Sequence, residues 1–138
     1  MINENPQVDA PMWKMLFTPY AKSVHLVRAQ VAKALAAWGC CGDAADDVVL
    51  ICSELAANAV QHARTPGRLF MVRLTLRGRE CLVEVSDATR VPPRRVAPGP
   101  EDERGRGLQL VAALAECTGH HDRDPLGKTV WARVLLPD

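Results

Sequence analysis

Apolar positions recur along this chain with two different periods, and the changes between them mark out the expected elements. Within residues 19–39 they recur every three or four positions, at Val24, Val27, Val31, Leu35 and Trp38. This spacing predicts one apolar face of an amphipathic helix, with Gly39 as its C-terminal stop. A second helix is expected from Asp43 to about Ala63, because acidic residues fill its first turn and Thr65-Pro66-Gly67 follows as a turn signal.

Other segments alternate between apolar and polar residues, which is the period of a half-buried strand. Two such segments are joined by a turn at Gly78-Arg79, and shorter apolar runs occur near both ends of the chain. Strands are therefore expected at residues 12–17, 69–77, 81–87, 120–123 and 130–136.

Residues 88–104 follow neither period, and contain four prolines, four arginines and three acids. A loop of this length in a compact domain is typical of a lid, a binding loop or a disordered segment. Gly105-Arg106-Gly107 then leads into a third amphipathic helix, which is expected to stop near Gly119.

The order strand, helix, helix, strand, strand, loop, helix, strand, strand predicts an α+β two-layer sandwich. We expect a mixed, mostly antiparallel sheet covered on one face by three helices. Residues 1–11 are polar and contain two prolines, so they are expected to form a flexible tail. Residues 12–138 are expected to form one domain, since their number is typical of a single hydrophobic core.

Composition narrows the class of function. A net charge of +1 over 138 residues argues against direct contact with nucleic acid. No apolar run approaches the roughly 20 residues that span a bilayer, and no signal-peptide pattern is visible at the N-terminus. The five cysteines form no CxxC pair. We therefore expect a cytoplasmic protein with reduced thiols and no contact with a membrane.

The second predicted helix carries a narrow polar wedge that includes Glu54 and Asn58, one turn apart. Taken alone, such a wedge is typical of a solvated outer face. Asn58, however, is an unfavourable residue inside a helix, and small residues flank the wedge. A carboxylate and an amide at this spacing suit a magnesium–phosphate site, with the amide oxygen as ligand and the carboxylate as proton acceptor.

Two further features carry chemistry. Asp87 has the strand parity of Cys81, Val83 and Val85, so its side chain is expected on the buried face, where it needs a donor. An adenine amino group is one such donor, and an ordinary turn cap is the alternative. Gly105-Arg106-Gly107 at a helix start would let backbone amides approach phosphates, or it is simply a flexible turn.

Four segments in order resemble the boxes of the GHKL (Bergerat-fold) ATPases. Residues 54–63, ELAANAVQHA, resemble the N box, and Asp87 stands where the first glycine box begins. Residues 105–111, GRGLQLV, resemble the second glycine box, and residues 127–132, GKTVWA, look like the closing strand with its threonine. The resemblance covers roughly residues 15–136 and is greatest to the anti-sigma-factor serine kinases and their actinobacterial relatives.

This resemblance implies the Bergerat ATP-binding fold and a role for each matched position. Glu54 is the expected catalytic base, and Asn58 is the expected Mg²⁺ ligand within the ATP site. Asp87 is expected to accept a hydrogen bond from the adenine amino group, with Thr129 supporting it by a hydrogen bond. The other expected ATP contacts come from the start of the third helix, at Gly105, Arg106, Gly107 and Leu108. Residues 88–104 are the expected ATP lid.

The function implied is that of a regulatory serine/threonine protein kinase that uses ATP and Mg²⁺ as cofactors. Its partners would be a sigma factor and an anti-anti-sigma (STAS-type) antagonist, and a homodimer is expected. The family's first glycine box reads Asp-x-Gly-x-Gly, whereas residues 87–91 here are DATRV and lack both glycines. A catalytically silent ATP-binding or nucleotide-free interaction module is therefore the alternative. A sensor histidine kinase module is a weaker third possibility, because no phosphoacceptor helix pair is visible.

Overall fold

The computed structural model describes residues 10–62, 68–88, 104–124 and 126–137, and the side chains of residues 62 and 104–107 are not described. Five strands and three helices follow the predicted order. Their bounds are β1 Met12–Phe17, α1 Lys22–Ala37, α2 Asp43–His62, β2 Phe70–Arg77, β3 Glu80–Asp87, α3 Arg104–Leu114, β4 Cys117–Asp122 and β5 Lys128–Leu135.

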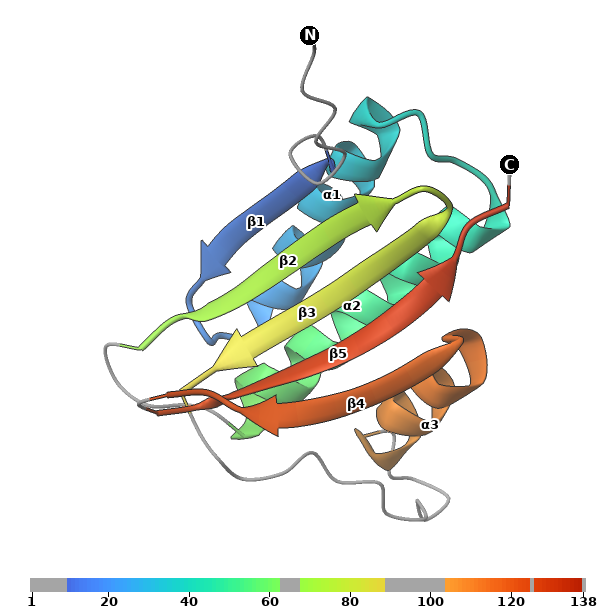
Figure 1. Cartoon of the computed structure of the whole chain (residues 1–138). Coiled ribbons are helices and arrows are strands. Elements are labelled where there is room, and N and C mark those ends of the chain that lie inside the picture. Colours follow the sequence, from blue (N-terminus) through green and yellow to red (C-terminus); the bar gives the residue numbers. More distant parts are fainter. Residues whose placement is uncertain (1–9, 63–67, 89–103, 125, 138) are drawn as a thin grey trace, which may run out of the picture.

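The strands form one sheet in the order β1-β2-β3-β5-β4, and every pair of neighbours is antiparallel. The three helices lie together behind one face of this sheet, and the other face carries no helix (Figure 1). The α+β two-layer sandwich is thus confirmed. The expected minority of parallel pairing does not occur among the described strands, whose four pairings are all antiparallel.

The core lies between α2 and the central strands. Alternate residues of β3 and β5 are buried on the helix side, as strand periodicity requires. The side of α2 that meets them is also apolar and almost fully buried, at Val48, Ile51, Cys52, Leu55, Ala56 and Ala59. Burial of this face stabilises the helix on the sheet, at about 25 cal/mol for each Å² of apolar surface removed from water.

The C-terminal end of α1 confirms the predicted glycine stop. Gly39 has a φ of 78°, in the left-handed region that favours glycine. The amide of Cys40 donates to the carbonyl of Leu35 at 2.9 Å, which closes the helix end with a backbone hydrogen bond.

The third helix differs from its prediction at both ends. It begins at Arg104, so that the two glycines lie inside its first turn, and it ends at Leu114. Gly119 is not a helix stop but a residue of β4 opposite Trp131. A Cβ atom at position 119 would lie 2.7 Å from Cζ2 of that indole. The glycine therefore serves the packing of Trp131 over β4, and the strand begins at Cys117, earlier than expected.

Residues 1–9 of the expected tail and residues 89–103 of the expected lid lie outside the described residues. Within the described ranges, none of the helices combines the length and the apolarity that crossing a bilayer requires.

Candidate functional site

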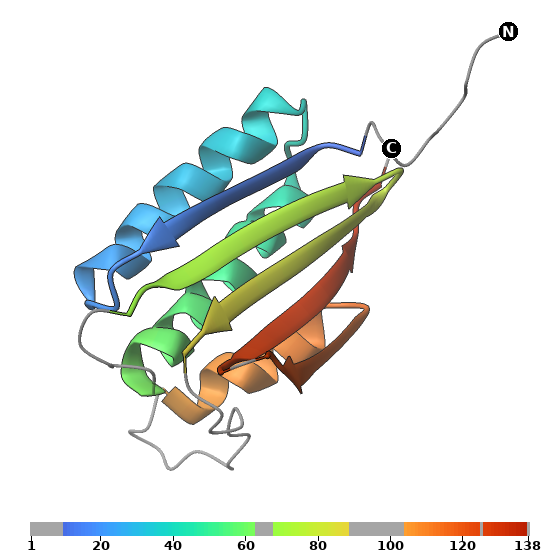
Figure 2. The ribbon, with the colours of Figure 1, turned by 60° about the vertical axis from the view of Figure 1, so that its left-hand side comes forward.

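The residues expected to form the site belong to elements that meet at one end of the sheet. The end of β3, the end of α2 and the beginning of α3 gather there (Figure 2). The helix α2 contacts α3 as well as β3 and β5. The fold thus brings the elements carrying Glu54, Asn58, Asp87 and Gly105 into one neighbourhood.

Asp87 lies on the helix side of β3, as its parity predicts, and only 3% of it is exposed. Its partner across the ladder is Lys128, the first residue of β5, which is 1% exposed. The Nζ atom of Lys128 donates to both carboxylate oxygens, at 3.2 Å to Oδ1 and 2.9 Å to Oδ2. A cation and an anion are therefore buried together at the end of the core, where each compensates the desolvation of the other.

Gly127 allows the chain to enter β5 so close to Asp87. Its φ is 106°, and a Cβ atom there would collide with the carbonyl oxygen of Asp87. Since only glycine accommodates both the conformation and the close approach, Gly127 fixes where Lys128 enters the ladder. The amide of Arg123 donates to the carbonyl of Gly127 at 2.9 Å, which ties the connection to the end of β4.

Thr129 was expected to support Asp87, but its hydroxyl makes a different contact. Thr129 is the ladder partner of Ser86, and the two hydroxyl oxygens lie 2.8 Å apart. Because side chains alternate along a strand, this pair lies on the helix-free face, opposite the side where Asp87 meets Lys128. The residue beside the Asp87 carboxylate is therefore Lys128.

Glu54 and Asn58 lie one turn apart on α2, and both are half-buried. Burial raises the pKa of the Glu54 carboxyl, while the positive charge of Arg28 on α1 lowers it to a smaller extent. A carboxylate whose proton affinity is raised by desolvation is a better proton acceptor than a solvated one. The side chain of Glu54 therefore suits the role of a general base.

The first turn of α3 contains Gly105, Arg106 and Gly107. The first four backbone N–H groups of a helix have no partner within it, and they point at the space before its first turn. Two glycines there let an anion approach the backbone closely. Leu108, by contrast, is 9% exposed and belongs to the hydrophobic core, so its side chain packs the helix against the sheet.

Some of these residues suit the binding of ATP and Mg²⁺ better than others. One amide oxygen, from Asn58, suits Mg²⁺, because this ion usually takes few protein ligands and completes its shell with phosphate oxygens and water. The start of α3 suits the phosphates. The carboxylate of Asp87, which would accept from the adenine amino group, already accepts two hydrogen bonds from Lys128. The part of the site that was predicted to bind the adenine base is therefore the part that differs from the prediction.

Lys128 is the residue that the sequence interpretation missed, although a signal for it was present. It has the parity of Val130, Ala132 and Val134, which form the helix-facing side of β5. A lysine on that side requires an anionic partner, since an unpaired buried ammonium is very unfavourable. Asp87, with the same parity on the neighbouring strand, was the candidate.

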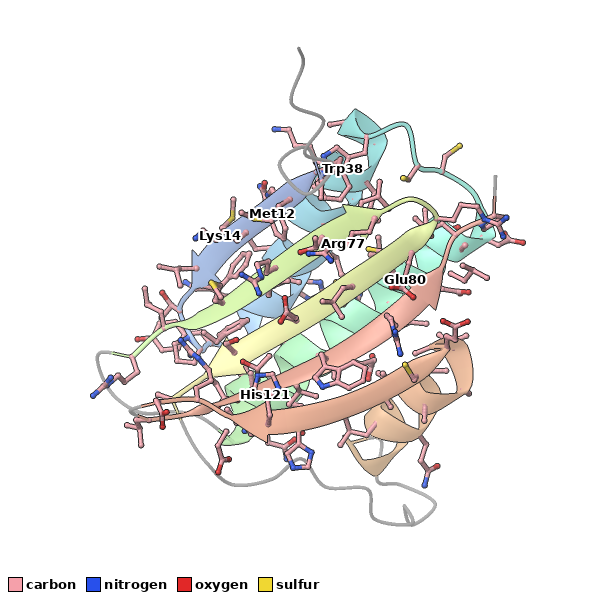
Figure 3. The ribbon with its side chains drawn as sticks, viewed as in Figure 1. Met12, Lys14, Trp38, Arg77, Glu80 and His121 are labelled. Carbon is pink, nitrogen blue, oxygen red and sulfur yellow. The ribbon has the colours of Figure 1, made fainter. Side chains whose placement is uncertain are left out.

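A separate pocket of about 500 Å³ lies on the helix-free face. Figure 3 shows three of its lining residues, Arg77, Glu80 and His121, which come from β2, β3 and β4. Its charged side chains are partly paired with one another: Nε of Arg73 donates to Glu84 at 2.8 Å. The sheet separates this pocket from Lys128 and its partner, so it does not belong to the predicted nucleotide site.

Comparison with solved structures supports the fold. This chain is similar to one in the crystal structure of the RsbU and RsbW domains of Rv1364c from Mycobacterium tuberculosis, with a TM-score of 0.66 and 22% sequence identity. The match covers 91% of this chain and 32% of that one, so this chain spans about a third of the length of that protein. At this identity the likeness shows a shared fold. Among curated proteins, none matches this chain.

Comparison with protein families gives a match over residues 17–134, described as the histidine kinase-like ATPase domain. The matched range runs from the last residue of β1 almost to the end of β5, and it includes Glu54, Asn58, Asp87 and Lys128. The chain therefore belongs to the histidine kinase-like ATPase domain family.

Proposed function

We propose that this domain is a Mg·ATP-dependent regulatory serine/threonine kinase of the anti-sigma type, acting in the cytoplasm. It would transfer the γ-phosphoryl group of ATP to a serine of a STAS-type antagonist, and it would bind a sigma factor in the alternative state. Family membership supports ATP as the ligand, and the likeness to a protein with an RsbW domain supports the regulatory class. The observation that carries the proposal is the desolvated carboxyl of Glu54, one turn from Asn58.

In the proposed reaction, Glu54 accepts the proton of the serine hydroxyl while the serine oxygen bonds to the γ-phosphorus. The bond from that phosphorus to the bridging oxygen breaks, and ADP leaves with the electron pair. Half-burial of Glu54 favours this step, because it raises the pKa of the carboxyl above its ordinary value, and the carboxylate then accepts a proton more readily. Asn58 would hold Mg²⁺ through its amide oxygen, and the ion, when bound, neutralises charge on the phosphates.

The first turn of α3 would bind the phosphates through its backbone N–H groups. Its two glycines, Gly105 and Gly107, present no Cβ atom that would keep a phosphate at a distance. Phosphoryl transfer depends mainly on positioning and charge neutralisation. The arrangement of α2 against α3 therefore supports the proposed chemistry with few catalytic side chains.

The test is transfer from γ-labelled ATP to a panel of STAS-domain proteins, with Glu54→Gln and Asp46→Asn compared with the wild type. Asp46 is an exposed carboxylate of the same helix, so Asp46→Asn is a matched control. We expect transfer by the wild type and by Asp46→Asn, and a loss of about 100-fold or more in Glu54→Gln. Absence of transfer to every candidate, with ATP binding intact, would reject the kinase.

A second candidate is a protein-interaction module without catalysis. The pairing of Asp87 with Lys128 favours it, because this carboxylate is the expected reader of adenine. Such a module would bind its partner equally well with and without ATP. A kinase of the proposed type would bind its sigma factor with an affinity that changes when Mg·ATP is added, which a pull-down titration measures.

A further inference from the structure

The pocket on the helix-free face of the sheet has no part in the proposed phosphoryl transfer. We propose that it is a docking site for an acidic segment of a partner protein, which places an apolar side chain on the floor of the pocket and a carboxylate on Arg77. Because the sheet separates this pocket from Glu54 and Asn58 on α2, docking here does not require a bound nucleotide.

The pocket forms because a pair of short side chains lies beside pairs of long ones. Thr75 of β2 and Leu82 of β3 are direct ladder partners, and both are half-buried in the lining. The next pair toward the turn between these strands, Arg77 and Glu80, forms one wall. The volume of about 500 Å³ lies within the range of known ligand sites, about 300–1,000 Å³.

Contacts with β4 turn the two large side chains of β5 away from this floor. Nε and Nη2 of Arg133 donate to Sγ of Cys117, at 3.1 and 2.7 Å. The indole of Trp131 packs over Gly119, where a Cβ atom would lie 2.7 Å from Cζ2 of the ring. Both side chains therefore line the pocket from the side of β4 and leave the floor at Leu82 open.

Positive charge is in excess on this face. Its strands carry four cations and two acids, a net charge of +2, although the whole chain has a net charge of +1. The cations are Lys14, Arg73, Arg77 and Arg133, and the acids are Glu80 and Glu84. Charge complementarity therefore favours an acidic partner, whereas two copies of this chain that met through this face would bring like charges together.

Arg77 is the cation of the pocket that is most available to such a partner. Nε and Nη2 of Arg73 both contact Oε1 of Glu84, at 2.8 and 2.7 Å, and Arg133 lies 3.7 Å from Glu80. Arg77 is exposed, and its guanidinium makes no hydrogen bond or ion pair within the part of the chain that the structure describes. A guanidinium binds a carboxylate through two parallel hydrogen bonds, so a carboxylate supplied from outside suits it.

The distance between the aromatic and the cationic parts of the pocket favours an extended segment. Trp131 is the ladder partner of Glu84, which is in turn the partner of Arg73, four residues before Arg77. At about 3.3 Å per residue, the two parts lie roughly 13 Å apart along the strands. About four or five extended residues span this length, so one segment reaches both the floor and Arg77.

The test is a selection of random peptides of about ten residues, displayed on phage, against the immobilised chain. We expect the selected peptides to combine aspartate or glutamate with an apolar or aromatic residue. Labelled copies of the tightest-binding peptide are then titrated with each variant, and fluorescence anisotropy measures the affinity. Arg77→Glu and Leu82→Glu should each weaken binding by about tenfold or more. Lys33→Glu, a charge reversal at an exposed position of α1, is the control and should stay within about threefold of the wild type.

Three outcomes would overturn the proposal: a selection that returns no binding peptide, selected peptides without enrichment in acids, and an affinity that Arg77→Glu leaves unchanged. A dimer that dissociates in folded Leu82→Glu, as measured by sedimentation equilibrium, would also overturn it, because a second copy of the chain would then occupy the face. Thermal melts show whether each variant folds. Since Arg77 is exposed, Arg77→Glu decides the matter if Leu82→Glu does not fold.

Discussion

Glu54 and Asp87 are two carboxylates expected in the same site, but they differ in burial and in their bonded partners. Asp87 is almost fully buried and receives two hydrogen bonds from Lys128. Glu54 is half-buried, and Arg28 acts on it only through space, so desolvation dominates and raises its pKa. A buried carboxylate that is bonded to a cation stabilises the fold as one half of an ion pair. A carboxylate whose pKa is raised by desolvation is suited to accept a proton.

The largest expected effect comes from breaking the ion pair between Asp87 and Lys128. Lys128→Met leaves the Asp87 carboxylate buried without its cation, which should lower the free energy of unfolding by about 3–5 kcal/mol. Urea unfolding followed by circular dichroism measures this loss. The double variant Asp87→Leu/Lys128→Met should recover most of it, since two apolar residues replace a buried pair at little cost. A loss below about 1 kcal/mol in the single variant would contradict the account, because this is the range of surface pairs.

The next effect concerns Glu54. The rate of phosphoryl transfer should fall toward acid pH through a pKa above the ordinary glutamate value, because the base must be ionised. Glu54→Gln should remove this acid limb together with about 100-fold or more of the rate. A pH–rate profile of wild type and variant measures both. A profile whose acid limb survives in Glu54→Gln would assign the proton transfer to another group.

The same raised pKa has a consequence for stability with a defined sign. The folded protein holds the proton of Glu54 more tightly than the unfolded chain does, so this contribution is present at low pH and is lost as pH rises through the raised pKa. Glu54→Gln should therefore melt no lower than the wild type above that pH. A clear drop in the melting temperature of the variant would mean that the charged carboxylate stabilises the fold.

A smaller loss is expected at Gly127, which holds the backbone beside Asp87. Gly127→Ala combines a φ of 106° with a collision against the carbonyl of Asp87, and should cost about 2 kcal/mol in stability. Gly78→Ala is the matched control: its φ is 60°, and no heavy atom lies within 4 Å of the added Cβ. The control should therefore cost about 1 kcal/mol. Equal losses in the two variants would show that the contact with Asp87 is unimportant.

The smallest effect is expected at Ser86, the residue before Asp87 in β3. Ser86→Ala removes the hydrogen bond to Thr129 and should cost about 1 kcal/mol. Because this pair lies on the opposite face from Asp87, the affinity for Mg·ATP measured by calorimetry should not change. A change in that affinity would mean that the two faces are coupled at this end of the sheet.

Much of the fold could be predicted from periodicity alone. Strand parity correctly placed Asp87 on the buried side, and the apolar arc of α2 was read from its period. Gly119 was misinterpreted because a glycine after apolar residues is typical of a helix end, while its reason here is the indole of Trp131 on another strand. A contact made with the next strand leaves no signal in the residues that flank Gly119.

The candidate site could be predicted only in part. The spacing of Glu54 and Asn58 follows from helix geometry, but the desolvation of Glu54 depends on how α2 packs against its neighbours. Thr129 was assigned to Asp87 from the order of residues in a motif. The register of β3 and β5, which motif order does not contain, places Lys128 there instead.

The account depends most on a magnesium-dependent ATP site on α2, and calorimetry with ATP, with and without Mg²⁺, tests it most directly. The wild type and Asp46→Asn should bind ATP with an affinity that rises when Mg²⁺ is present, and Asn58→Ala should lose that rise. ATP binding that depends neither on Mg²⁺ nor on Asn58, or no binding at all, would contradict the account.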